Sequence, residues 1–383
     1  MPPTLKDIAA EAGVSAATVS NVINGNRSRV SPGTRDRILR IVERHGYVPS
    51  APARSLAARS SRIIGLLIPA ADKDSLTLSP HTAGVIGTLE RALRAHDYHL
   101  MIRGIARPSE VAEALRTWNL DGAVLLGFHD AEINRLRRRS VGDVALVAMD
   151  SYADNPLALR VRSDDRAGAR LATRHLLDLG HRRIAFAGPE CPATGVVRER
   201  FEGFRQAFAD AGLTWEESLR FTVDTSLAAG REVGRRIAAG TPDVTAVVAT
   251  ADTLAIGVME GLAAEGKTVP GDVSIVGYDD ADIASLVTPK LTTVAQDLRA
   301  KSALAVRLLL DRLAGAPRPD QATALDVHLI ERGTTAPTAP RRGSTAPGST
   351  GQSQCSRSGS RTRRPPGPGT SPRTGPPATP PET

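Results

Sequence analysis

The 383-residue sequence is poor in cysteine, in aromatic residues and in long apolar runs. Its two cysteines, Cys191 and Cys355, are too few and too far apart for a disulfide framework or a cysteine-rich metal site, which fits a reducing compartment. The most apolar stretch, residues 63–71, falls well short of the roughly 20 residues that a membrane-spanning helix needs. The N-terminus is polar and charged and shows no secretory signal. We therefore expect a cytoplasmic protein that has no membrane partner.

Lysine is also scarce, and the net charge of +8 is unevenly distributed along the chain. Residues 1–62 hold ten basic and four acidic side chains, and residues 334–383 hold seven and one. Residues 63–333 hold 32 basic and 36 acidic side chains, so a basic head and a basic tail flank a mildly acidic body. A basic head indicates an anionic partner such as DNA.

The head contains three short amphipathic segments. Thr4 begins the first helix as a capping residue, and Gly13 ends it before a second helix over residues 15–24. A third helix opens at Ser31, which is followed by a first-turn proline. Two short helices joined by a glycine-containing turn, and then a third helix, are typical of a helix-turn-helix unit.

The outer face of the second helix carries small or polar side chains, which let a helix lie deep in the major groove of DNA. Asn21 has the amide needed for a bidentate contact with adenine, and Ala16 and Ala17 can contact thymine methyl groups. Hydroxyl groups at the helix N-terminus suit the phosphate backbone. The alternative is a small helical bundle with a solvated polar face. The predicted DNA-binding residues of the head are Thr4, Ser15, Ala16, Ala17, Thr18, Ser20, Asn21 and Asn24.

Residues 49–61 join the head to the body. Pro49 and Pro52 exclude a long helix, but a short helix tolerates Pro52 in its first turn. Such a helix would expose Arg54 and Leu56, and an exposed apolar Leu56 suits a wedge into the minor groove. The alternative is that Leu56 packs on the body. We expect Arg54 and Leu56 to contact DNA.

The body alternates short apolar runs with amphipathic helices, in two similar halves. The expected strands are residues 63–68, 100–102, 123–126, 145–148, 184–187, 221–223, 246–249 and 274–276. The expected helices are residues 82–96, 109–118, 131–138, 167–180, 197–211, 228–239 and 254–265. This alternation predicts parallel sheets covered by helices, with a ligand site at the carboxyl ends of the strands between the halves.

The composition changes abruptly near residue 334. Eleven of the last 50 residues are proline, and most others are serine, threonine, glycine or arginine. Such a segment buries too little apolar surface to offset the entropy of ordering, so residues 334–383 are predicted to be a disordered tail. A passive tail is the simpler interpretation, and nonspecific attraction to DNA is the alternative.

One segment, from Gly261 to Thr268, matches the phosphate-loop pattern GxxxxGK[ST] in full. A phosphate cradle requires a strand before the first glycine and a helix that begins near the lysine. Here helical spacing runs through Gly261, and Gly266 followed by Val269–Pro270 indicates a helix end. We therefore predict no nucleotide site there.

The sequence has no GxSxG, HExxH or CxxC motif, so we assign no catalytic residue, metal ligand or cofactor.

Three ordered segments closely resemble the headpiece, hinge and first body strand of the LacI-type repressors. They read TLKDIAAEAGVSAATVSNVINGN, RVSPGTRDRIL and HGYVPSAPARSLAARSSRIIGLLIP, and the resemblance extends to LIERGTT near residue 335. It implies an all-α helix-turn-helix headpiece (1–48), a hinge (49–61) and an α/β bilobed, periplasmic-binding-protein-like body (62–333) whose lobes are joined by three crossovers. It also implies a ligand-responsive repressor that binds a palindromic operator as a homodimer, with a small effector, such as a sugar, in the interlobe cleft.

The resemblance also implies which side chains line that cleft. Asp164, Arg200 and Asp279 match positions that contact the small ligand in the family, although each charge alone could be a solvated loop residue. Relatives often carry aromatic rings where this chain has His81 and Thr82, and aromatic residues make up only 3% of the sequence. We therefore leave the ligand unassigned. The predicted ligand-binding residues are His81, Thr82, Asp164, Arg200, Asp252 and Asp279.

Two other classes of protein fit parts of the sequence. A solute-binding protein that serves a transporter would share the body, but it would need an export signal and no basic head. A cytosolic sugar-processing or nucleotide-dependent enzyme rests almost entirely on the phosphate-loop look-alike. The sequence therefore favours a DNA-binding regulator over an enzyme.

Overall fold

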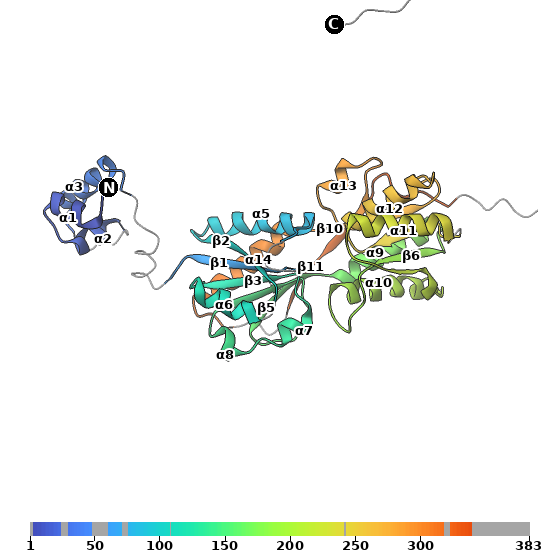
Figure 1. Ribbon diagram of the computed structural model, residues 1–383, viewed down its shortest axis with the longest axis horizontal. Coiled ribbons are helices and arrows are strands. Elements are labelled where there is room, and N and C mark those ends of the chain that lie inside the picture. Colours follow the sequence, from blue (N-terminus) through green and yellow to red (C-terminus); the bar gives the residue numbers. More distant parts are fainter. Residues whose placement is uncertain are drawn as a thin grey trace, which may run out of the picture. The chain divides into compact units, whose positions relative to one another are not determined.

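The computed structural model describes residues 3–23, 30–47, 60–70, 76–107, 109–240, 243–317 and 322–338 (Figure 1). Its first part is a three-helix head, formed by α1 (Leu5–Ala12), α2 (Ala16–Ile23) and α3 (Pro32–Arg44). Thr4 begins α1 with a capping box, in which its hydroxyl accepts from the Asp7 N–H and the Asp7 carboxylate accepts from the Thr4 N–H. One buried side chain from each helix, Ile8, Val19 and Ile38, meets in the core.

The body has two lobes, each built on a six-stranded sheet. The N-lobe sheet is parallel throughout, in the order β11-β5-β4-β3-β1-β2. Its strands are β1 (Ile63–Pro69), β2 (His99–Ile105), β3 (Gly122–Leu126), β4 (Ala145–Met149), β5 (Ala158–Ser163) and β11 (Thr323–Leu325). Its helices are α5 (Pro80–Arg94), α6 (Ser109–Thr117), α7 (Asp130–Asn134), α8 (Arg138–Val141) and α14 (Leu298–Leu313).

The C-lobe repeats this arrangement, in the order β12-β10-β9-β8-β6-β7, with β12 alone antiparallel to its neighbour. Its strands are β6 (Ile184–Gly188), β7 (Arg220–Thr222), β8 (Ala246–Ala249), β9 (Ser274–Asp279), β10 (Thr292–Gln296) and β12 (Val327–Ile330). Its helices are α9 (Asp165–Asp178), α10 (Val196–Asp210), η2 (Glu217–Leu219), α11 (Leu227–Gly240), α12 (Asp252–Ala264) and α13 (Ile283–Leu286).

Three crossovers join the lobes, as the family resemblance implies: β5 leads to α9, β10 leads to α14, and β11 leads to β12. Two of them have the same local structure. Asp164 caps α9 and Asp297 caps α14, with φ/ψ of −77°/82° and −78°/83°, and each carboxylate accepts from the N–H three residues on. These caps fix the direction of each helix at the point where the chain changes lobes.

Several elements were not expected from the sequence, among them β5, α13, β10, α14, β11 and β12. The structure also differs from two predictions. The expected helix over residues 131–138 is split into α7 and α8, because the Asn155 amide donates to the carbonyls of Ile133 and Leu136 and so draws them away from a continuous helix. Residues 334–338, predicted as the start of the tail, pack on the C-lobe. There the Ile275 N–H donates to the Thr334 carbonyl, and Thr334 is fully buried.

Other predictions lie outside the described residues. They are the hinge helix with Arg54 and Leu56, the head residue Asn24, and the tail beyond residue 338. None of the helices in the described part of the chain combines the length and the apolar character that a membrane span requires.

Helices α11 and α12 pack against each other through glycines. A Cβ on Gly230, Gly234, Gly257 or Gly261 would overlap a backbone oxygen of the other helix, so the two backbones are in contact. Gly261 is the first glycine of the phosphate-loop look-alike, and it lies inside α12 rather than after a strand. The helix ends where the Lys267 N–H donates to the Leu262 carbonyl. The segment is therefore a helix end, as predicted.

We expect Gly261→Ala to lower the free energy of unfolding by about 3 kcal/mol, because the added methyl group forces the two backbones apart. Gly240→Ala is the control, since a Cβ on Gly240 meets nothing within 4 Å. Urea unfolding of the full chain measures both variants. Equal stability of the two would contradict the close approach of the helices.

Candidate functional site

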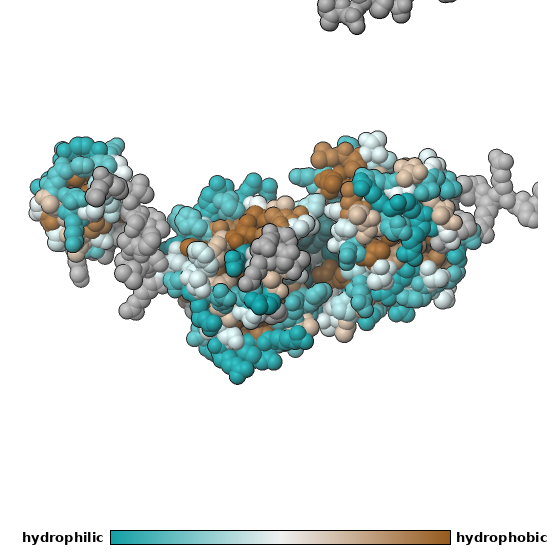
Figure 2. Space-filling view, viewed as in Figure 1, coloured by the Kyte–Doolittle hydropathy of each residue, from teal (hydrophilic) through white to brown (hydrophobic). Residues whose placement is uncertain are grey.

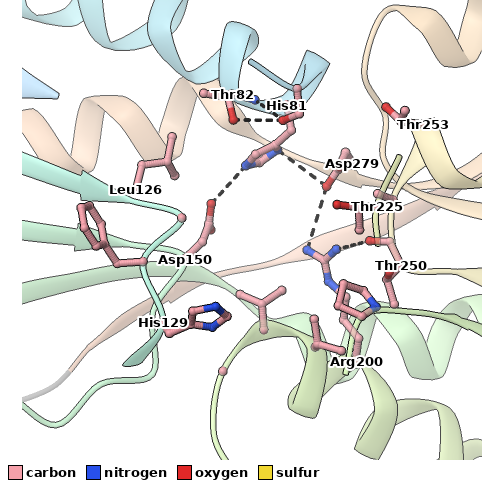
Figure 3. Close-up of a pocket in the computed structure, with 18 of the residues that line it drawn as sticks. His81, Thr82, Leu126, His129, Asp150, Arg200, Thr225, Thr250, Thr253 and Asp279 are labelled. Atoms are coloured by element: carbon pink, nitrogen blue, oxygen red, sulfur yellow. Dashed lines mark hydrogen bonds and ion pairs between the residues drawn. The ribbon is translucent and has the colours of Figure 1, made fainter. Parts of the chain in front are cut away.

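A cavity of about 420 Å³ lies between the lobes and is lined by residues of both (Figure 3). Five of the six predicted ligand residues line it: His81, Thr82, Arg200, Asp252 and Asp279. Asp164 is not among the lining residues, because its carboxylate accepts from the Ala167 N–H as the cap of α9. We therefore propose no ligand contact for Asp164.

A ring of five polar side chains borders this cavity, and three of its members, His81, Asp150 and Asp279, line it. In the N-lobe, the Lys301 ammonium donates to Asp150 Oδ1 at 2.6 Å, and Asp150 Oδ2 lies 3.1 Å from His81 Nε2. His81 Nδ1 faces Asp279 Oδ1 of the C-lobe at 3.6 Å, too long for a hydrogen bond but within ion-pair range. Gln296 completes the ring, because its amide donates to Asp279 at 2.7 Å and its carbonyl accepts from Lys301 at 2.5 Å.

Two carboxylates of this ring stand on unusual backbone. Asp150 follows β4 with φ of 54°, and Asp279 ends β9 with φ of 117°. Positive φ is costly for residues other than glycine and persists where the surroundings enforce it. Both positions point a carboxylate at the His81 ring, as Figure 3 shows. The strain is thus located at the junction of the lobes.

Burial and charge shift the pKa values of this ring in opposite directions. Burial opposes the ionised carboxylate of Asp150, but the Lys301 ammonium outweighs it, so the pKa of Asp150 lies below its ordinary value. Burial also disfavours the charged ring of His81, yet the Asp279 and Asp150 carboxylates raise its pKa above the usual 6.5. Protonated His81 therefore stabilises the folded protein below pH 6.5, and this contribution is lost as the pH rises through the raised pKa.

Arg200 links α10 to neighbouring elements of the C-lobe. Its guanidinium pairs with Asp165 at 2.9 Å, donates to the Thr250 carbonyl at 2.5 Å and stacks 3.5 Å from the centre of the Tyr278 ring. Burial opposes its charge, but Asp165 outweighs that effect and raises the pKa of Arg200. Asp279 lies farther away, at 3.9 Å. Arg200 is therefore largely occupied by protein partners.

Asp252 lies at the start of α12 and is 1% exposed. Its carboxylate accepts from the Thr293 hydroxyl at 2.5 Å and from the Ala281 N–H at 2.8 Å. Burial, and then the nearby Asp279 carboxylate, raise the pKa of Asp252 to about 8. The described residues contain no group of histidine, cysteine or carboxylate side chains arranged to hold a metal ion.

The predicted DNA-reading face is on the outer side of α2. Ala17 is exposed and Ala16 and Asn21 are half-buried, whereas Val19 and Val22 face the core. Ser15 accepts from the Thr18 N–H at 3.1 Å and so begins the helix. Thr4 is exposed but is already engaged in its capping box. The remaining predicted contact that the structure describes, Ser20, lies on the same helix, half-buried.

Sequence reasoning missed four residues of the cavity network: Asp150, Asp165, Gln296 and Lys301. Asp150 and Gln296 each follow or end an apolar strand, so the rule that identified Asp279 would have found them. Asp165 directly follows Asp164. Choosing the site residue between these two required knowing which of them caps α9. Lys301 is fully buried inside a helix, and nothing in the local sequence distinguishes it from a surface lysine.

Comparisons with known proteins agree with this arrangement. The family described as bacterial regulatory proteins, lacI family, matches residues 4–50, and a periplasmic binding protein-like domain matches residues 173–335. The HTH-type transcriptional regulator CelR of Thermobifida fusca is 34% identical over 346 residues, which are 86% of this chain and 97% of that protein.

Two solved structures are similar over almost the same span. The CelR–cellobiose complex has a TM-score of 0.65 at 31% identity, covering 87% of this chain and 99% of the other. The lac repressor dimer bound to operator and the anti-inducer ONPF has a TM-score of 0.75 at 25% identity, covering 88% and 100%.

A helix-turn-helix head followed by a two-lobed body with an interlobe cavity defines a DNA-binding transcriptional regulator that responds to a ligand. The chain belongs to the lacI family of bacterial regulatory proteins.

We expect Arg200→Ala to lower the free energy of unfolding by about 3–5 kcal/mol, because it leaves the buried Asp165 carboxylate without its cation. The double variant Arg200→Met with Asp165→Asn should recover part of this loss, since neither member of the buried pair is then charged. Arg198→Ala, at a partly exposed ion pair with Glu202, is the matched control. Urea unfolding that finds Arg200→Ala no worse than Arg198→Ala would contradict the buried pair.

Proposed function

We propose that this regulator is a repressor that binds a palindromic operator as a homodimer and takes a neutral sugar in the interlobe cavity. One observation carries the proposal: the cavity borders the ring that joins Asp150 and His81 of one lobe to Asp279 of the other. A ligand there contacts both lobes, so its affinity depends on the angle between them. In the same proposal residues 1–48 are the headpiece, 49–61 the hinge and 62–333 the effector-binding body.

The charge of the cavity supports a neutral ligand. Its described lining residues include five acidic side chains, those of Asp130, Asp150, Glu190, Asp252 and Asp279, of which Asp252 is mostly protonated at neutral pH because its pKa is raised to about 8. The one guanidinium, on Arg200, is already paired. A phosphate or carboxylate ligand would meet excess negative charge, whereas sugar hydroxyls can donate to these oxygens. The relative solved with cellobiose supports a sugar.

The exposed apolar residue Leu286 supports self-association. It lies on α13 and is 79% exposed, and Figure 2 shows an apolar patch over that helix. Exposed apolar patches often mark protein interfaces. The similar lac repressor structure is a dimer on its operator.

We propose no enzymatic activity, and we place the protein in the cytoplasm because its proposed partner is chromosomal operator DNA.

Gel-shift binding to the DNA upstream of the protein's own coding region tests this function. We expect a salt-sensitive, sequence-specific complex whose affinity changes about tenfold or more with one of three sugars, cellobiose, maltose or ribose. A solute-binding protein or an enzyme would form no such complex. Binding that is equal on unrelated DNA would reject the proposed function.

In the head, we expect Asn21→Ala to change the preferred operator sequence at one base pair, because a bidentate amide contact contributes about 1–3 kcal/mol of discrimination. A binding selection from random DNA measures the preference. Asn134→Ala, at an exposed site in α7 of the body, is the control. An unchanged preferred sequence in Asn21→Ala would show that this side chain does not read a base.

A further inference from the structure

The cavity contains an unsatisfied acceptor that is not part of the ring of His81. Asp130 begins α7 in the N-lobe and is 6% exposed. Its Oδ1 accepts from the Ser151 hydroxyl at 2.7 Å and from the Tyr152 N–H at 2.9 Å. Its Oδ2 is buried and has no hydrogen-bond partner among the described residues. A buried carboxylate oxygen without a donor is costly, and a ligand in the adjoining cavity can supply that donor.

The N-terminus of α10 lies opposite, on the C-lobe. Gly195 precedes the helix with φ of 115° and provides no side-chain cap. Asp130 Oδ2 lies 3.7 Å from the position that a Cβ on Gly195 would occupy. Asp130, Gly195, Val196 and Val197 all line the cavity. The first amide groups of a helix have no partner within it, so donors and an acceptor face the same space.

We propose that Asp130 and the first turn of α10 together hold one hydroxyl group of the sugar, an inference that rests on the proposed function. The hydroxyl donates its proton to Asp130 Oδ2 and accepts a hydrogen bond from an amide of α10. Because the two partners belong to different lobes, the hydroxyl joins them. In Figure 3, His129, which precedes Asp130, lies across the cavity from His81. The ligand therefore bridges the lobes between Asp130 and the start of α10.

A charged group on the ligand would suit only one of the two partners, either the Asp130 carboxylate or the first amides of α10. A phosphate suits the amide end of a helix, but here it would face the Asp130 carboxylate. An ammonium group suits Asp130, but it would face the positive end of the α10 dipole. A hydroxyl both donates and accepts, so it fits both. Asp130 thus determines specificity for a neutral sugar over its phosphorylated form.

The test uses Asp130→Asn in the full chain. The variant keeps the acceptor for Ser151 and Tyr152 and replaces Oδ2 by an NH₂ donor. Calorimetric titrations use cellobiose, maltose and ribose, each compared with its phosphate monoester. For the sugar that the wild type binds, we expect about tenfold or greater loss of affinity. We also expect a smaller preference for that sugar over its phosphate, because the repelling carboxylate is gone.

Asp154→Asn is the matched control, since that carboxylate is in the same lobe and is 97% exposed. The ratio of the two affinities does not depend on the fraction of folded protein, so it separates a role in specificity from a loss of structure. If Asp130→Asn binds both compounds as Asp154→Asn does, the inference is wrong and the proposed function stands. If the wild type binds none of the three sugars, the proposed function fails, and the inference fails with it.

Discussion

The structure depends on a closed ring of buried polar contacts in which Asp150 and Asp279 face the same histidine from different lobes. Lys301 and Gln296 complete it, so each charge in the ring has a partner. Burying such charges without partners would be costly, whereas each charge in the ring faces an opposite charge when the lobes are together, and only His81 Nδ1 is left without a hydrogen bond among the buried atoms of the ring. The position of the lobes is therefore set by polar contacts, while each lobe has apolar core clusters of its own.

This arrangement explains how a small molecule can control a DNA-binding protein. The lobes are linked by three short crossovers, two of which are held by the matched caps Asp164 and Asp297. The crossovers fix the attachment of the lobes but leave their angle to the residues around the cavity. A ligand that supplies hydrogen bonds to both lobes favours one lobe angle over another only if it binds the two arrangements with different affinities. The ring and the ligand thus act on the same equilibrium.

Much of the fold follows from local sequence signals. The three head helices, four strands of each lobe and the helix end at Gly266 were predicted from caps, periodicity and turn residues. The expected elements stopped at residue 276 and so missed β10 and the 16-residue helix α14, besides β11 and β12, which are only three and four residues long. Short strands of this kind are defined by their partners in the sheet, which are distant in sequence.

The site was only partly predictable, for a similar reason. Polar residues at strand ends identify positions near the cavity, and Asp279 was found in this way. The ring itself depends on Lys301, which reaches Asp150 from a helix 151 residues away. Likewise, Asp130 was not predicted, since its importance lies in an oxygen that the fold leaves without a donor. These features arise from tertiary packing and have no local signature.

A double-mutant cycle between His81→Gln and Asp279→Asn, measured by urea unfolding of the full chain, tests the ring most directly. At pH 6, where His81 is protonated, we predict a coupling free energy of about 1 kcal/mol, as expected for charged neighbours in one network. The coupling should shrink as the pH rises through the raised pKa of His81, because the proton that attracts Asp279 is lost. Additive effects of the two substitutions at pH 6 would contradict the account.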